Sequence, residues 1–266
     1  MSAIWLSLLL ATAGSPDVAV PEREAAVIAA CATWNIEREA AAAPAVHRVE
    51  PDGLCFTGDI TAESSAAFVE ALSGFDPTLP LVVVAMSEGG EVNAGMAMGE
   101  ALVPRTATVV AHRVCASSCG NYLFTAGDRR VIDDDALLLF HGGARLIDEA
   151  ELRAAIAPQV PVDQLDAQVA MVLADLGKQV GRQDAFLEFA GVDVDLFRWM
   201  AGFNALSEEE YFALCPVRDP TMILYSDALL AEHGIVVHEN RGPKSDEAVA
   251  AGVAALGRPG VACFMD

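Results

Sequence analysis

Short apolar runs alternate with segments of helical periodicity along this chain. The apolar, β-branched runs predict strands, at residues 53–57, 81–86, 107–114, 136–140 and 235–237. Apolar residues at helical spacing predict helices between and around them, within 15–46 and near 61–73, 92–102, 164–180, 206–214 and 227–232. Run 81–86 has no polar interruption, which is typical of a strand buried on both faces of a parallel sheet. The order of elements predicts an α/β fold of stacked units joined by right-handed crossovers.

Three polar turns follow three of the predicted strands, at residues 87–91, 115–120 and 141–143. In a parallel sheet the carboxyl ends of the strands lie along one edge, and ligands bind there. We therefore expect the three turns to converge on one site.

The second of these turns places Ser117 and Ser118 between Cys115 and Cys119, before Gly120. Small residues at a strand-to-helix junction bring a hydroxyl to a helix N-terminus, where free N–H groups favour negative charge. A nucleophilic serine needs such surroundings because its attack creates an oxyanion. A capping serine beside a close-packing glycine explains the same residues without catalysis.

Composition restricts the partners. The net charge of −22 argues against nucleic acid and anionic membrane as partners. Residues 1–13 are apolar, too short to span a bilayer, and end in Ala11-Thr-Ala13, so they predict a signal peptide and export to the periplasm. No basic residue precedes Arg23, so an apolar N-terminal helix of a cytosolic protein stays open as the alternative.

Six cysteines in an exported chain permit disulfides. Cys115 and Cys119 are close enough in sequence to bridge around the serines, and either Cys31 or Cys215 can pair with Cys263. The sequence contains no CxxC pair and no His/Cys spacing suited to zinc. We therefore expect neither a metal nor a cofactor.

Five motifs occur in order along the chain. They are a strand and turn, a Gly-Gly turn with its helix, a serine turn, a strand-end histidine and a terminal helix end, at residues 54–60, 87–96, 116–127, 139–143 and 232–236. Taken together, they resemble the proteolytic subunit of the Clp protease. The resemblance implies the ClpP/crotonase fold, a spiral of ββα units with a mostly parallel sheet and a helical arm, and a serine peptidase activity. It runs from about 49 to 237 and is poor over 144–220.

The resemblance also implies roles for single residues. Ser118, two residues before Gly120, matches the nucleophile, and Ser117 is then a structural neighbour. His141 matches the general base.

The expected oxyanion hole consists of backbone N–H groups from the Gly89–Gly90 turn and from Cys119, where the family usually has methionine. Asp219 falls near the position of the third catalytic residue, and a turn residue before Pro220 is the equal alternative.

The sequence thus predicts a signal peptide (1–13), an N-terminal helical segment (15–46), a ClpP/crotonase-like domain (47–240) and a C-terminal tail (241–266). The tail is expected to be loose unless Cys263 ties it down. The expected function is ATP-independent peptidase action on a peptide or protein, because an exported protein has no ATP supply for an ATPase partner. The helical arm implies a homo-oligomer. A catalytically inactive binding module and a crotonase-like acyl-CoA enzyme are the alternatives.

Overall fold

The computed structural model describes residues 20–39, 46–202, 222–258 and 262–266, together with Ser207, Glu209, Glu210, Ala213, Cys215 and Gly260. The predicted signal peptide, most of the predicted 206–214 helix and Asp219 lie outside the described residues.

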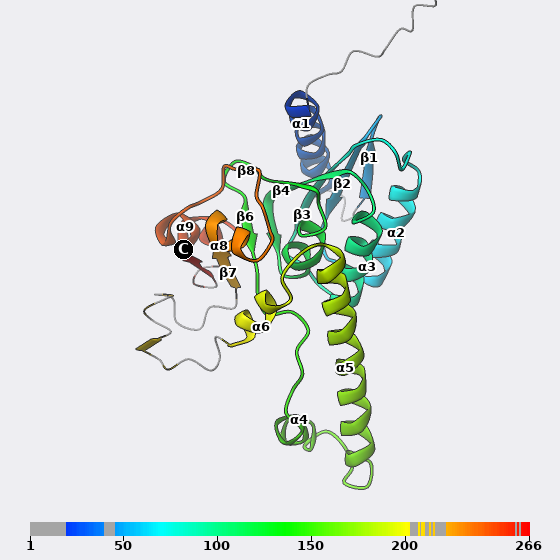
Figure 1. Cartoon of the computed structure of the whole chain (residues 1–266), viewed down its shortest axis with the longest axis vertical. Helices are drawn as coiled ribbons and strands as arrows, with labels where there is room; N and C mark the ends of the chain where they lie inside the picture. Colours follow the sequence, from blue (N-terminus) through cyan, green and yellow to red (C-terminus); the bar gives the residue numbers. More distant parts are fainter. Residues whose placement is uncertain are drawn as a thin grey trace, which may run out of the picture.

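A seven-stranded sheet forms the centre of the protein, and every neighbouring pair in it is parallel except β1 with β2. The path of the sheet is β1-β2-β3-β4-β5-β8, with β6 paired to the far end of β4. Its strands are β1 (Val46–Val49), β2 (Gly53–Thr57), β3 (Leu81–Ser87), β4 (Ala107–Ala116), β5 (Arg129–Ile132), β6 (Leu137–Leu139) and β8 (Glu239–Asn240). Figure 1 shows the central strands enclosed by helices, so the α/β class is confirmed.

The side chains of β3 show why the strand is apolar throughout. Val83 and Ala85 face a core that contains helices α2 (Ala62–Ser73) and α3 (Val92–Leu102). Val82 and Val84 face the opposite core, which contains helix α1 (Val20–Glu39). The period of two places successive residues on opposite faces, so a strand covered on both sides carries no polar face.

Helices cover both faces of the sheet. On one face lie α2, α3, a short π-helix η1 (Cys119–Phe124) and the C-terminal part of α5 (Leu165–Phe189). On the other face α1 covers the first strands, and α9 (Asp246–Ala255) packs against β6. The remaining helices are α4 (Glu149–Ile156), α6 (Asp195–Gly202) and α8 (Asp227–Glu232).

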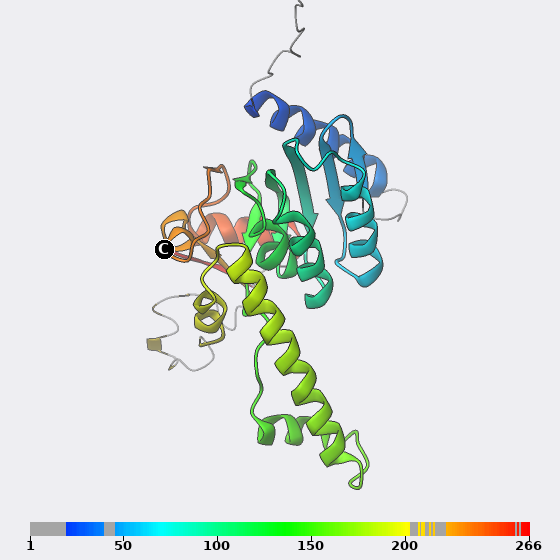
Figure 2. The ribbon, with the colours of Figure 1, turned by 45° about the vertical axis from the view of Figure 1, so that its right-hand side comes forward.

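Helix α5 is the longest element and its N-terminal part extends away from the sheet, with α4 beside it (Figure 2). Only its C-terminal end enters the core, where Phe186 and Leu187 are buried. The helix confirms the prediction at 164–180 but continues for more than two further turns. Among the described residues no helix combines the length and apolar character needed to cross a membrane.

One expectation near the C-terminus is wrong, and another is settled by its stated condition. The predicted strand at 235–237 is irregular, and the strand lies two residues later at β8, where the backbone of Arg130 and Ile132 is available for pairing. The predicted loose tail is folded into α9 and β9 (Ala262–Met265), and β9 pairs in parallel with β7 (Met222–Tyr225). A disulfide from Cys215 to Cys263 ties it down, which was the condition attached to that expectation.

All six cysteines are paired. Cys115 bridges Cys119, as the sequence spacing suggested, and Cys31 bridges Cys55 on β2 rather than Cys263. Disulfides persist in oxidising compartments.

Removing the Cys31–Cys55 bridge should lower stability without affecting the site. The bridge closes a loop with a sequence separation of 24, which corresponds to about 3 kcal/mol of denatured-state entropy. We expect the double variant Cys31→Ala, Cys55→Ala to unfold about 6–12 °C below the wild type in a thermal melt. An unchanged melting temperature would show that α1 is held by its packing alone.

Candidate active site

The three polar turns predicted to converge do so at the carboxyl ends of β3, β4 and β6. The Gly89–Gly90 turn packs directly on the serine turn: a Cβ on Gly89 would lie 2.6 Å from the Cβ of Ser117 and 2.9 Å from the nitrogen of Ser118. The serine turn is joined to the histidine turn by the N–H of Ser117, which donates to the carbonyl of Leu139 at 3.0 Å. The glycine, serine and histidine turns therefore meet at one edge of the sheet.

Ser117 is the serine that contacts the histidine. Its Oγ lies 2.5 Å from Nε2 of His141, and both side chains are partly exposed to solvent. Ser117 has a φ of 54°, a left-handed conformation that L-residues other than glycine seldom adopt. Such strain at a strand-to-helix turn is known from the nucleophile elbow of hydrolases, where it presents the hydroxyl to substrate.

Ser118, expected to be the nucleophile, points elsewhere. It has an ordinary right-handed helical conformation, is 2 % exposed, and its Oγ donates to the carbonyl of Gly90 at 2.8 Å. A Cβ on Gly95 would lie 2.9 Å from the Cβ of Ser118, so α3 covers it closely. The pairing of Ser118 with His141 is therefore corrected: Ser118 joins the glycine turn to the serine turn, and Ser117 meets the histidine.

The Gly89–Gly90 turn, which packs on the serine turn, contains a backbone N–H group that has no partner among the described residues. Gly90 forms a parallel bridge with Ile60 that uses the carbonyl of Gly89 and the N–H of Glu91. Within the described part of the chain, neither the N–H of Gly90 nor that of Ser118 has a hydrogen-bond acceptor. Ser118 is buried, whereas Gly90 is exposed and can be reached from solvent, and two free N–H groups beside a hydroxyl are suited to bind an incoming oxygen atom.

His141 is oriented by the backbone rather than by a carboxylate. Its Nδ1 lies 2.7 Å from the carbonyl oxygen of Gly142. A carbonyl only accepts, so Nδ1 carries the proton, and Nε2 is then free to accept from the hydroxyl of Ser117. The backbone is fixed by Asn121, whose Nδ2 donates to the carbonyl of His141 at 3.0 Å. Asp219, the expected third residue, lies outside the described residues.

A register shift of one residue explains why Ser117 was passed over. Counting from Gly120 assigned Ser118 as the nucleophile and Cys119 as the next N–H donor. Cys119 is the position of the serine turn that departs from the family pattern, and the structure shows it in a disulfide with Cys115. Because Cys119 departs from the family, counting back from Gly120 does not by itself decide between Ser117 and Ser118 as the nucleophile.

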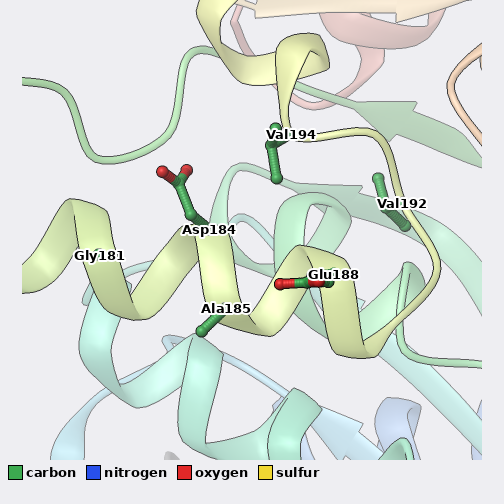
Figure 3. Close-up of a pocket in the computed structure, with 6 residues that line it drawn as sticks. All are labelled: Gly181, Asp184, Ala185, Glu188, Val192 and Val194. Carbon is green, nitrogen blue, oxygen red and sulfur yellow. The ribbon is translucent and has the colours of Figure 1, made fainter.

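A hollow of about 720 Å³ lies apart from these residues, along α5. Its lining consists of Gly181, Asp184, Ala185, Glu188, Val192 and Val194 (Figure 3). Asp184 is already paired with Arg198 at 3.0 Å, and no residue of the serine, histidine or glycine turns lines the hollow. It adds nothing to the chemistry of Ser117 and His141.

A histidine–carboxylate pair elsewhere on the sheet is structural. Nδ1 of His112 on β4 lies 2.7 Å from Asp133, and Arg241 lies 2.7 Å from the other oxygen of that carboxylate. His112 is thus a satisfied histidine, and Asp133 is 7 % exposed. No group of three or more metal-ligating side chains occurs among the described residues.

Asp133→Asn should weaken stability more at neutral pH than in acid. Burial alone would raise the pKa of Asp133, but hydrogen bonds from Arg241 and His112 outweigh it and hold the pKa below its ordinary value. The stabilisation is therefore complete above pH of about 4 and is lost as the pH falls through the lower folded-state value. In urea unfolding we expect a deficit of about 2 kcal/mol at pH 7, smaller at pH 3. A deficit independent of pH would contradict this.

The sequence was also compared with known proteins. It matches no family model, and it matches no curated protein at significant similarity.

Proposed function

We propose that this protein is a serine hydrolase with Ser117 as nucleophile and His141 as general base. The observation that carries the proposal is the 2.5 Å contact between Ser117 Oγ and His141 Nε2, in a turn where Ser117 is strained and accessible. Serine is a weak nucleophile unless a base removes its proton, and an imidazole held in one tautomer is such a base.

The proposed reaction is acyl transfer in two steps. Ser117 Oγ attacks a carbonyl carbon while its proton moves to His141 Nε2, and the imidazolium then returns this proton to the leaving amine or alcohol. Water then attacks the acyl carbon while one of its protons moves to the same nitrogen, and the imidazolium returns that proton to Ser117 Oγ as the bond to the acid breaks. The bond from Nδ1 to the carbonyl of Gly142 stabilises the imidazolium in both steps.

The N–H groups of Gly90 and Ser118 are proposed as the oxyanion hole. In hydrolases the residue after the nucleophile commonly supplies one donor, and here that residue is Ser118, not Cys119. Ser118 adds a second role, because its hydroxyl holds the carbonyl of Gly90 and thereby fixes the other donor. Donors fixed before the reaction lower the barrier most.

The substrate class and the finer fold rest on the resemblance to the Clp proteolytic subunit. We propose a ClpP/crotonase-like fold and a peptide or protein substrate, cleaved without an ATPase partner. The three disulfides suit an oxidising compartment and therefore export.

Mapping the site of covalent modification tests the proposal. The folded, oxidised protein is treated with a fluorophosphonate probe and digested, and the adduct is located by mass spectrometry. We expect one adduct, on Ser117, and none after heat denaturation. An adduct on another serine, or none on the native protein, would refute Ser117 as nucleophile.

A further inference from the structure

One side chain of the arm helix α5 reaches the segment that carries His141. Gln183 lies near the C-terminal end of α5 and is 3 % exposed. Its Oε1 accepts from the N–H of Ala144 at 2.7 Å, and its Nε2 donates to the carbonyl of Ala144 at 3.1 Å. The amide thus engages both backbone groups of one residue, as a neighbouring strand would.

A tyrosine on η1, the helix that follows the serine turn, fixes this amide in place. The hydroxyl of Tyr122, on η1, donates to Oε1 of Gln183 at 2.7 Å. Burial raises the pKa of Tyr122, so the hydroxyl stays protonated and remains a donor at any ordinary pH. The N–H of Ala144 only donates and its carbonyl only accepts, so Oε1 of Gln183 must face the N–H, and the amide has one orientation in which Tyr122 donates to the same oxygen.

Gly143 makes the approach of Gln183 possible. A Cβ at this position would lie 2.0 Å from Oε1 of Gln183 and 2.8 Å from its Cδ. The second glycine after His141 is therefore explained by the space that the glutamine amide occupies.

The segment from His141 to Ala144 depends on such anchors because it leaves the sheet. Strand β6 ends at Leu139, and residues 141–148 form no helix or strand. Asn121 holds the carbonyl of His141, and Gln183 holds Ala144 three residues later. Two buried amides from two different helices therefore fix the stretch that includes the carbonyl of Gly142, the partner of Nδ1.

We propose that Gln183 is a positioning residue, which keeps the imidazole of His141 in line with Ser117 by fixing the backbone from Gly142 to Ala144. The consequence for catalysis rests on the proposed hydrolase function, whereas the consequence for the imidazole does not. The arm helix then contributes directly to the geometry of the site.

The test compares Gln183→Leu with the matched control Gln179→Leu. Gln179 lies one turn earlier on α5, is only partly buried, and makes no side-chain hydrogen bond within the described residues. Two quantities are measured: the rate constant of fluorophosphonate labelling, and the NMR signal of the hydrogen-bonded Nδ1 proton of His141, assigned with His141→Gln. For Gln183→Leu we expect labelling 10- to 100-fold slower and loss or broadening of the Nδ1 proton signal. Gln179→Leu should match the wild type in both.

Gly143→Ala should displace the backbone from Gly142 to Ala144 without altering Gln183, because the added Cβ collides with the amide of Gln183. If Gln183→Leu fails to fold, Gly143→Ala decides, with the same two changes expected. Wild-type values in a folded Gln183→Leu, or in Gly143→Ala, would overturn the positioning role while leaving the hydrolase intact. If the wild type is not labelled, the hydrolase proposal fails, and the Nδ1 signal alone decides whether Gln183 orients His141.

Discussion

Ser117→Ala is expected to abolish labelling by a fluorophosphonate probe and to reduce hydrolysis of an activated ester such as p-nitrophenyl acetate by at least about a thousandfold. The change removes the only hydroxyl within hydrogen-bond distance of His141 Nε2 among the described residues. The side chain is small and partly exposed, so we expect the free energy of unfolding to change by less than about 1 kcal/mol. Labelling gels and a urea titration measure both quantities.

Ser118→Ala is the matched control, because it differs in position by one residue and makes the same chemical change. It leaves the carbonyl of Gly90 without its donor at 2.8 Å, which should cost about 1–3 kcal/mol of stability. Labelling should persist on Ser117, at a reduced rate because the N–H of Gly90 is less firmly fixed. Loss of labelling in Ser118→Ala together with full labelling of Ser117→Ala would restore Ser118 as the nucleophile.

The sheet could be predicted from the sequence where a strand is buried on both faces. At β3 and β4 the apolar run is itself the signal, and both strands lie within about two residues of the prediction. Strand β5 was missed because Arg129 and Arg130 open it. Arg129 pairs with Glu24 on α1, and Arg130 donates to the carbonyl of Thr125; no local sequence pattern reveals either partner.

The residue types of the site and their convergence could be predicted from the sequence, but not which of the two serines contacts the histidine. The convergence of the glycine, serine and histidine turns follows from strand order alone. The choice between Ser117 and Ser118 depends on which residue takes the left-handed conformation, and two adjacent serines carry the same local propensity. The orienting group of His141 is a backbone carbonyl, which has no signature in the sequence, and Gln183 lies 42 residues further along the chain.

Gly90→Ala is expected to have the second largest effect, on both activity and stability. Gly90 has a φ of 150°, and a Cβ there would lie 2.1 Å from the carbonyl oxygen of Ile60. That oxygen belongs to the backbone and already accepts from the N–H of Glu91, so the glycine turn has to move instead. We expect a loss of about 2–4 kcal/mol in the free energy of unfolding. Ester hydrolysis should fall by about 100- to 1000-fold, since a displaced oxyanion donor costs this much in related chemistry.

Gly191→Ala separates the backbone cost of a positive φ from the cost of displacing the glycine turn. Gly191 also has a positive φ, 70°, but a Cβ there meets nothing within 4 Å. This variant therefore carries only the backbone cost of about 1 kcal/mol and should retain wild-type labelling of Ser117. If Gly90→Ala loses stability but keeps its labelling rate, the N–H of Gly90 takes no part in the reaction. The oxyanion would then depend on the N–H of Ser118 alone, and the contact from Ser118 to Gly90 would serve only to hold the two turns together.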